Sequence, residues 1–320
     1  MKQRARAEGT NYLCCNGNWG IIYGGFFGGI MIIIQLKGGL GNQMFQYALY
    51  RELLHRGRQV KIDDVKGFEH DKLRVPVLDR FGIEYERATP AEVVKITDSY
   101  MDIFSRIRRK LTGRRTKEIN EKEGIFDPKI LEVEDAYLVG YWQSDKYFPS
   151  QPVIEEIQEV FGKRPQEIMH DSVSWSTLQQ IECCESVSIH VRRTDYIDEE
   201  HNAVHNLCSE KYYKNAIKMV RDAHPNAVFF IFTDDREWCK NHFKGHNFIT
   251  VELQEGEFTD VADMLLMSRC KHHIMANSSF SWWSVWLNDS PEKMVIAPAK
   301  WINFKRMDDI YTSRMTKVDV

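Results

Sequence analysis

The sequence predicts an α/β protein with two Rossmann-like domains that face each other across a cleft. After residue 31, short apolar runs alternate with segments of helical spacing, which is typical of parallel sheets covered by helices. Loops rich in glycine, charge or hydroxyl groups follow several of these runs, where ligands meet parallel sheets. The chain has 320 residues, of which 43% are hydrophobic, and this is enough for two such domains.

The first domain is expected at residues 31–155. The continuous apolar run MIIIQL at 31–36 predicts a strand buried on both faces. After the loop KGGLGN, the apolar spacing in QMFQYALYRELLHRG, residues 43–57, predicts a helix that ends at Gly57. Further strands are expected in QVKID and AYLVGYWQ, and the basic segment RIRRKLTGRR is interpreted as a solvated loop or helix face.

The second domain is expected at residues 156–320. The boundary is expected near 145–165, around three prolines, and the segment PVIEEIQEVFG in this region predicts a helix. Its predicted strands are SVSIHV, AVFFIF, NFITV, HHIMA and KMVIAP. Its predicted helices lie at about 209–223, 235–243, 259–270 and 279–288.

Residues 1–30 are interpreted as a leader outside the fold. They begin basic and then become apolar, but they contain six glycines between Gly17 and Gly29, a poor composition for a helix. A membrane anchor is the alternative interpretation. The seven cysteines form no C-x-x-C pair, which favours a reduced, cytosolic compartment. The net charge of −3 excludes an overall basic field for nucleic acid.

The loop KGGLGNQ resembles a dinucleotide-binding turn only in part. Gly39 and Gly41 match the pattern, but Met44 stands where the third glycine belongs. An acidic pair, Asp63 and Asp64, follows about twenty residues on, where a ribose-binding acid would lie. A nicotinamide-dependent oxidoreductase and a tight turn without a ligand therefore stay open for this loop.

The segment SIHVRRTDY places two arginines directly after a strand. Side chains alternate along a strand, so His190 and Arg192 are expected on one side and Arg193 and Asp195 on the other. Arg192 would then face a ligand, for which its guanidinium fork suits a diphosphate, while Asp195 holds Arg193. A purely structural Arg–Asp pair is the alternative.

Polar groups also follow two later strands. In NSS at 277–279, Asn277 or Ser278 can cap the next helix and leave N–H groups and hydroxyls for an anion. Asp263 is expected early in the preceding helix, and the tryptophans at 282, 283 and 286 are expected in the core. Asp234 and Asp235 are interpreted as a helix cap or loop, with a metal site as the alternative.

Five stretches, taken together and in order, resemble one family. MIIIQLKGGLGNQMFQYA, GYWQS, HVRRTDY, FTDD..WC and MANSSFSWWSVWL are similar to the bacterial α-1,2-fucosyltransferases of glycosyltransferase family 11. The similarity runs from residue 31 to about 301. Thr194 and Ser284 depart from the glycines common in this family, which bears on linkage and acceptor rather than on the donor.

This resemblance implies a two-domain GT-B-like fold and transfer of L-fucose from GDP-β-L-fucose to O2 of a terminal β-galactoside, with inversion. It implies a GDP-fucose-binding second domain, an acceptor-side first domain, and no metal or cofactor. The expected catalytic residues are Arg192 and Asp195. The expected donor contacts are His190, Arg192, Arg193, Asp263, Asn277, Ser278 and Ser279; the expected acceptor contacts are Gly41, Asn42, Gln43, Trp142 and Gln143.

The expected partners are GDP-fucose and a galactose-terminated oligosaccharide or lipid-linked glycan, without nucleic acid or stable membrane insertion. The expected location is the cytoplasm or the periphery of the inner membrane. The base is left open among Asp195 and residues 198–200. A fucosyltransferase of another linkage and a non-catalytic glycan- or nucleotide-binding protein are the remaining alternatives.

Overall fold

A computed structural model describes residues 30–122, 124–163, 172–193, 208–253, 256 and 258–320. The chain from Met31 to Val320 forms one compact unit. The expected leader therefore lies almost wholly outside the described residues, as do Thr194, Asp195 and residues 198–200.

The first sheet has four strands, all parallel, in the order β2-β1-β4-β3. Its strands are β1 (Ile32–Gln35), β2 (Val60–Asp63), β3 (Glu118–Asn120) and β4 (Ala136–Val139). The central strand β1 is buried at every position, as its continuous apolar sequence predicts. Three of the four strands follow the sequence pattern, whereas β3 is too short and too polar to show one.

Helices and turns of this half surround the sheet. They are α1 (Leu40–His55), η1 (Leu78–Phe81), α2 (Pro90–Ile96), α3 (Ile103–Thr112), η2 (Pro128–Glu132), η3 (Asp145–Tyr147), α4 (Gln151–Gln158) and the π-helical turn η4 (Glu159–Lys163). Helix α1 begins three residues before the predicted start, because Gly39 serves as its N-cap, and Gly57 follows its end with a φ of 76°.

The second sheet has six parallel strands in the order β10-β9-β8-β5-β6-β7. Its strands are β5 (Ser186–Val191), β6 (Val228–Thr233), β7 (Phe248–Thr250), β8 (His272–Ile274), β9 (Val295–Pro298) and β10 (Met315–Val318). The five predicted strands are confirmed, and their observed ends differ from the predicted ends by two residues or fewer. Strand β10 was not predicted, since its burial is confined to its first residue.

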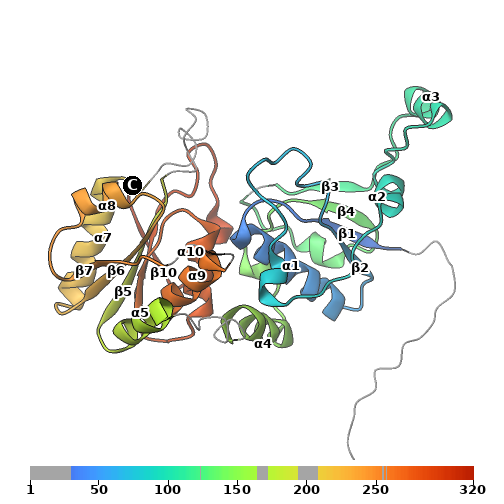
Figure 1. The fold of residues 1–320 in the computed structure, drawn as a ribbon. Coiled ribbons are helices and arrows are strands. Elements are labelled where there is room, and N and C mark those ends of the chain that lie inside the picture. Colours follow the sequence, from blue (N-terminus) through green and yellow to red (C-terminus); the bar gives the residue numbers. More distant parts are fainter. Residues whose placement is uncertain (1–29, 123, 164–171, 194–207, 254–255, 257) are drawn as a thin grey trace, which may run out of the picture. The chain divides into compact units, whose positions relative to one another are not determined.

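The helices of this half are α5 (Ser172–Glu182), α7 (Glu210–Ala223), α8 (Arg236–His242), α9 (Thr259–Arg269), α10 (Ser279–Leu287) and the turn η7 (Asp308–Ile310). Four match the predicted segments. The apolar side chains of β5 at 187, 189 and 191 pack with α7 in one core cluster, whereas Phe230 and Phe232 of β6 belong to another cluster with α9 and α10. The two faces of the sheet thus bury different helices (Figure 1).

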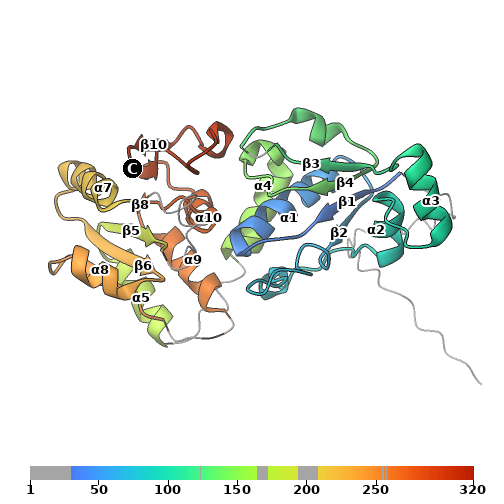
Figure 2. The ribbon, with the colours of Figure 1, turned by 90° about the horizontal axis from the view of Figure 1, so that it is seen from above.

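Helices α1 and α10 lie against each other and join the two sheets through one hydrophobic core (Figures 1 and 2). The Phe45 ring lies 4.5 Å from that of Trp282 and 4.8 Å from that of Trp283. Both tryptophans are fully buried, which confirms their predicted place in the core. The result is the predicted α/β, GT-B-like architecture of two parallel sheets.

Within the part of the chain that the structure describes, none of the helices combines the length and apolar character needed to cross a bilayer.

Candidate functional site

Three adjacent strands of the second sheet end in charged or hydroxyl-bearing residues. The parallel register pairs Val191 at the end of β5 with Thr233 at the end of β6, and β8 lies on the other side of β5. Arg192 and Arg193 follow β5, Asp234 and Asp235 follow β6, and the segment 277–279 follows β8. Because the carboxyl ends of parallel strands meet at one edge, these side chains gather there.

His190 is the most unusual of these residues, because it is buried and incompletely hydrogen-bonded. Its side chain is directed to the α10 side of the sheet, where its ring centroid lies 5.5 Å from that of Phe280. The residue is 4% exposed, and its buried Nδ1 atom has no hydrogen-bond partner among the residues that the structure describes. Burial, with a smaller effect of the Arg192 charge, lowers the His190 pKa to about 3. The imidazole is therefore neutral at physiological pH, and its Nδ1 is available to a ligand.

Arg192 lies two residues beyond His190 at the same sheet edge. Its Nε atom is 3.8 Å from an oxygen of the Asp234 carboxylate, and a third of its side chain is exposed. The Asp234 carboxylate also accepts a 2.8 Å hydrogen bond from the backbone N–H of Arg193. Asp234 thus holds the backbone directly after β5, where the two arginines follow the strand. Part of the Arg192 side chain stays exposed to solvent.

Arg193 has a different set of partners. Its Nε donates a 3.2 Å hydrogen bond to Asp235, and its guanidinium carbon lies 4.6 Å from the centroid of the Trp238 ring. Asp235 also accepts from the backbone N–H of Trp238 and so caps α8, as the sequence predicts. The sequence predicts Asp195 as the partner of Arg193. Asp195 is outside the described residues, and the described partner is Asp235. The sequence contains a signal for this contact, because Arg193 and Asp235 follow two strands that are neighbours in the parallel sheet.

The start of α10 lies at the same edge of the sheet as Arg192 and Arg193. Ser278 is its N-cap and accepts a hydrogen bond from the backbone N–H of Phe280, which confirms the predicted capping role. Asn277 is 8% exposed and donates a 3.0 Å hydrogen bond to the carbonyl oxygen of Trp301. Asn277 therefore holds the turn, and the partly exposed Ser278 and Ser279 are the residues of this turn that a ligand can reach. The first turn of a helix also carries the positive end of its dipole.

Asp263 lies in the second turn of α9, which packs on β6. Burial, reinforced by the nearby Asp260 charge and opposed by that of Arg236, raises the Asp263 pKa to about 7. Since Arg236 begins α8 directly after the acidic pair, Asp263 faces the same edge of the sheet. A carboxyl group that changes its charge near pH 7 is typical of functional sites.

The glycine-rich loop of the first half packs against the start of α10. A Cβ atom at Gly41 would lie 2.6 Å from the carbonyl carbon of Ser279 and 2.8 Å from the nitrogen of Phe280. An acceptor contact is predicted at Gly41 from the family resemblance. The structure corrects that role, because Gly41 is buried and allows the two helix starts to approach each other.

The remaining predicted acceptor residues divide into two groups. Gln43 is 0% exposed, and its amide bonds to the backbone of Gly38, Val75 and Val77. Trp142 is 1% exposed, with its ring edge-on to that of Tyr147. Both side chains are buried, and the indole Nε1 of Trp142 has no hydrogen-bond partner among the described residues. An acceptor contact by either side chain stays a prediction.

Asn42 and Gln143 differ from these residues because both are only partly buried. The Gln143 amide nitrogen donates a 2.7 Å hydrogen bond to Asn42, which ties the start of α1 to the loop after β4. These two residues remain the predicted acceptor contacts that the described surface leaves accessible.

The acids considered for a nicotinamide cofactor are engaged elsewhere. Asp63 accepts a 2.7 Å hydrogen bond from the hydroxyl of Tyr137, and Asp64 accepts hydrogen bonds from Tyr85 and Arg87. Met44, in place of the third glycine, is fully buried. Neither acid offers an open ribose contact, and this observation disfavours the oxidoreductase alternative.

One group among the described residues has the spacing of metal ligands: Glu185, His224 and His272. The Nδ1 atom of His272 accepts the backbone N–H of Met294, so its Nε2 carries the ring proton and donates to Glu185 at 2.8 Å. A metal at this Nε2 would need that proton to leave. The group is a hydrogen-bonded cluster at the beginning of β5 and β8.

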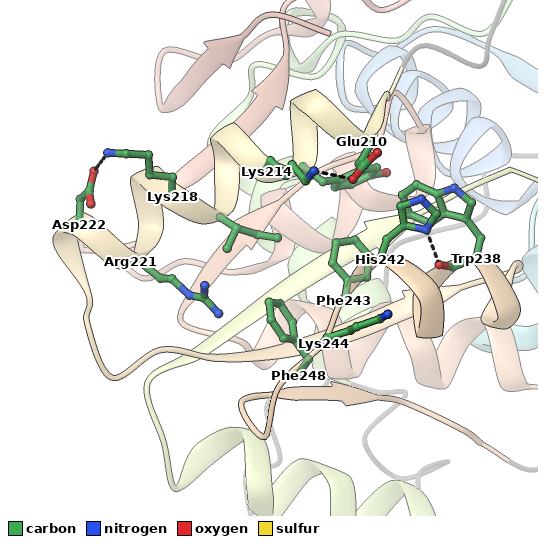
Figure 3. A pocket seen from close by; sticks show the side chains of 12 residues that line it. Glu210, Lys214, Lys218, Arg221, Asp222, Trp238, His242, Phe243, Lys244 and Phe248 are labelled. Atoms are coloured by element: carbon green, nitrogen blue, oxygen red, sulfur yellow. Dashed lines mark hydrogen bonds and ion pairs between the residues drawn. The ribbon is translucent and has the colours of Figure 1, made fainter.

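A surface cavity of about 430 Å³ lies along α7 and α8 (Figure 3). Four of its charged residues form two ion pairs within α7, Lys214 with Glu210 and Lys218 with Asp222, and the His242 ring stacks on Trp238 at 4.0 Å. None of the predicted site residues lines this cavity. It adjoins the site through Trp238, which supports Arg193, and through Tyr213, whose hydroxyl donates a 2.9 Å hydrogen bond to the carbonyl oxygen of His190.

The protein has two parallel sheets, with cationic and hydroxyl groups at one edge of the second sheet, and comparisons with known proteins identify its family. The family model described as glycosyl transferase family 11 matches residues 129–317, more than half of the chain. An Escherichia coli alpha-1,2-colitosyltransferase is 33% identical over 292 residues, covering 87% of this chain and 94% of that protein. The chain belongs to glycosyltransferase family 11.

Two further relatives extend the comparison. The O-antigen biosynthesis glycosyltransferase WbnK of Escherichia coli is 31% identical over 289 residues, covering 83% of this chain and 93% of that protein. Human galactoside alpha-(1,2)-fucosyltransferase 1 is 28% identical over 103 residues, which is 32% of this chain and 28% of that protein. Among solved structures, NodZ alpha-1,6-fucosyltransferase soaked with GDP-fucose aligns with a TM-score of 0.42 at 15% identity, covering 81% of this chain and 92% of that one.

Proposed function

We propose that this glycosyltransferase transfers L-fucose from GDP-β-L-fucose to O2 of a terminal β-galactoside with inversion at fucose C1. The observation that carries the proposal is the buried, neutral His190, which lies beside Arg192 and the capped start of α10 and whose Nδ1 has no partner in the described part of the chain. In a nucleotide sugar, the His190 nitrogen can bond the base and the Arg192 guanidinium can bind the diphosphate. The N–H groups at the helix start favour the negative charge of that diphosphate.

In the proposed step, the galactose O2 oxygen forms a bond to fucose C1 while the bond from C1 to the β-phosphate oxygen breaks. The electron pair of that bond leaves with GDP, and negative charge grows on the diphosphate. Arg192 and the backbone N–H groups at the start of α10 stabilise this charge, with the hydroxyls of Ser278 and Ser279 nearby. The acceptor hydroxyl loses its proton to a base or late in the step; Asp195 stays a prediction for that base.

For the guanine base, the proposal uses His190 and Asp263, the positions that the family resemblance assigns to it. An ionised Asp263 accepts hydrogen bonds from the N1 and N2 groups of guanine. For the acceptor, it uses the Asn42–Gln143 pair, because these amides are accessible and held by one hydrogen bond. The natural acceptor is proposed to be a galactose-terminated oligosaccharide or lipid-linked glycan.

Colitosyl transfer is the second candidate, favoured by the Escherichia coli colitosyltransferase that aligns along 87% of this chain. Colitose is fucose without its 3-hydroxyl group. A site that hydrogen-bonds the 3-hydroxyl discriminates strongly against colitose, which lacks this group. An apolar site that fits colitose discriminates only weakly against fucose. The ratio of kcat/KM for the two GDP-sugars therefore distinguishes the candidates.

The experiment measures GDP release by the purified full-length chain from GDP-fucose and from GDP-colitose, with a β-galactoside present or absent. NMR of the product identifies the linkage and the anomeric configuration. A new α-linked fucose on O2 supports the proposal. Transfer to another hydroxyl, retention of configuration or a strong preference for GDP-colitose contradicts the corresponding part.

We also propose that the transfer needs no metal ion. The acidic pair after β6 is engaged by Arg193 and the N-terminus of α8, and Arg192 supplies positive charge for the leaving group. EDTA should leave the rate nearly unchanged. A large loss that Mg²⁺ or Mn²⁺ restores would make Asp234 and Asp235 ligands instead.

A further inference from the structure

Helix α3 (Ile103–Thr112) carries large apolar side chains that the protein does not cover. None of its residues is buried. Phe104 is 81% exposed and Leu111 is 80% exposed, and Ile103 and Ile107 are also among the exposed large hydrophobic residues. In Figures 1 and 2, α3 lies beyond α2, at the outer end of the first half. Solitary exposed apolar residues are ordinary, but several on one short helix mark an interaction surface.

These apolar residues share one face of the helix. At about 100° per residue, Ile103, Phe104, Ile107 and Leu111 fall within an arc of about 100°. The cations flank this arc on the helical wheel, with Arg108 on one side and Arg106 and Lys110 on the other. The helix sequence IFSRIRRKLT has four cationic residues and no acidic residue.

The polar side of α3 is attached to the protein. Arg108 forms an ion pair with the buried Asp98, and Arg109 donates hydrogen bonds of 3.1 Å and 2.6 Å to the carbonyl oxygens of Asp98 and Tyr100. Asp98 adopts a φ of 50° and also accepts the backbone N–H of Arg115, so it closes the chain around the base of the helix. The contacts hold α3 by its cations and leave the apolar arc exposed.

Two cations beside the apolar arc are not used in this attachment. Arg106 and Lys110 form no ion pair with any residue that the structure describes. Their charge, with that of the flanking Arg114 and Arg115, makes the surface around the apolar residues mainly positive, although the exposed N-cap residue Asp102 adds a carboxylate at the start of the helix. A partner must therefore offer apolar volume and negative charge together.

We propose that α3 is a membrane-binding helix that inserts its apolar arc between the headgroups of anionic phospholipids. Phe and Leu side chains then enter the boundary with the acyl chains, while the arginines and Lys110 contact lipid phosphates. A second copy of the chain is a poorer occupant, since apposed α3 helices would bring like charges together. The inference depends on α3 alone and not on the proposed donor or acceptor.

The test measures sedimentation of the full-length chain with vesicles of phosphatidylglycerol and phosphatidylethanolamine, and with vesicles of phosphatidylcholine alone. The wild-type protein should bind the anionic vesicles, and added salt should weaken the binding. Phe104→Ser together with Leu111→Ser should lower the vesicle partition coefficient at least about tenfold. Arg106→Glu with Lys110→Glu should lower binding to the anionic vesicles selectively.

Phe304→Ser is the matched control, because Phe304 is 76% exposed on another part of the chain and its loss should leave vesicle binding unchanged. All variants should unfold near the wild-type temperature, since they change exposed side chains. Absence of wild-type binding, or equal binding by the Phe104 and Leu111 variant, overturns the proposal. Light scattering that shows a dimer, dissociated by the same variant, would identify a second copy as the occupant instead.

Discussion

The carbonyl oxygen of Gly41 accepts a 2.8 Å hydrogen bond from the indole Nε1 of Trp283. Gly41 belongs to the first turn of α1 and Trp283 to α10, so the bond crosses from the first half of the chain to the second. At the same place, the backbone of Gly41 lies against that of Ser279 and Phe280. Two loops that the sequence marks separately therefore meet in one contact, next to the capped turn proposed for the diphosphate.

Gly41→Ala should destabilise this contact. A methyl group would lie 2.6 Å from the Ser279 carbonyl carbon, and backbone atoms on both helices must shift to admit it. Overpacking of this kind costs about 1–3 kcal/mol of unfolding free energy. Because the shift displaces the start of α10, the affinity for GDP-fucose should fall as well. Urea denaturation and calorimetric titration measure the two effects.

Gly39→Ser is the control for this substitution. The Cβ at Gly39 would meet only Arg74 Nε at 3.9 Å, and serine is a favourable N-cap residue for α1. Its unfolding free energy should stay within about 0.5 kcal/mol of the wild type. If Gly41→Ala is equally mild, the close approach of the two helices is not needed for stability.

The adjacent arginines should respond differently to substitution by lysine. Arg192→Lys keeps a charge but loses the guanidinium fork beside the proposed leaving group. Removing one such donor costs about 2.7–4 kcal/mol, or roughly a hundred- to a thousandfold in kcat. Its unfolding temperature should stay near that of the wild type, because its described ion-pair distance is a long 3.8 Å.

Arg193→Lys should lower stability as well as activity. It weakens the contact with Asp235 and the stacking on Trp238, which together contribute about 1 kcal/mol of unfolding free energy at a partly exposed site. Rates with GDP-fucose and melting curves for both variants test the difference. Equal rate losses without a difference in melting would show that the two roles are wrongly assigned.

The strand and helix pattern of this chain could be predicted from sequence wherever burial is regular. β1 and β5 are buried along their whole length, and both were predicted as continuous apolar runs. β3, by contrast, has three residues and no buried one, and α5 falls in a segment that reads as polar. Such elements depend on their neighbours in space, which a local pattern does not contain.

Site residues at strand ends could be placed by topology, but their hydrogen-bond partners could not. The order of parallel strands brings Arg193 and the acidic pair to one edge, yet which aspartate contacts it depends on the turn geometry that makes Asp235 a helix cap. Gln43 shows the opposite limitation. Its amide looks like a ligand contact in sequence, but the chain uses it to bond three backbone groups around the glycine loop.

Donor affinity should depend on pH through Asp263. Its folded-state pKa is raised to about 7 from 3.8, so below pH 7 the Asp263 carboxyl is protonated in the free protein. It must lose this proton before it can bind guanine as a carboxylate. Affinity for GDP-fucose should then decrease by up to about tenfold per pH unit as the pH falls below 7. The same raised pKa makes the Asp263 contribution to folding decline as the pH rises from 3.8 to 7. Titration calorimetry without acceptor measures the affinity.

Two variants separate this carboxyl group from other titrating groups. Asp263→Asn should bind GDP-fucose weakly at every pH and show a flat profile. Asp260→Asn removes a nearby negative charge that raises the Asp263 pKa, so its midpoint should move to lower pH. An unchanged profile in Asp263→Asn would mean that another group controls donor binding.

His190→Phe should separate donor binding from stability. The buried Nδ1 of His190 has no partner within the described ranges, so an aromatic ring without that atom removes an unsatisfied polar group, which costs about 1–3 kcal/mol. We expect the unfolding free energy of the variant at pH 7 to equal or exceed that of the wild type, while the affinity for GDP-fucose falls at least about tenfold. His273→Phe is the matched control. His273 is equally buried, but its ring nitrogens bond Ser188 and Asn288 at 2.8 Å each, so this variant should lose stability.

The pH dependence of stability gives an independent measure of the same group. The His190 pKa is lowered from 6.5 to about 3 in the folded protein, so the unfolded chain takes up a proton below pH 6.5 that the folded chain does not. The wild type therefore loses stability as the pH falls from 6.5 towards 3, and His190→Phe lacks this loss. Its advantage over the wild type should grow by about 1.4 kcal/mol per pH unit over that window. Urea denaturation at pH 7, 6 and 5 measures the difference, and a constant difference would show that the pKa of His190 is not lowered in the folded protein. A His190→Phe variant that binds GDP-fucose normally would show that this histidine is a core residue and not part of the donor site.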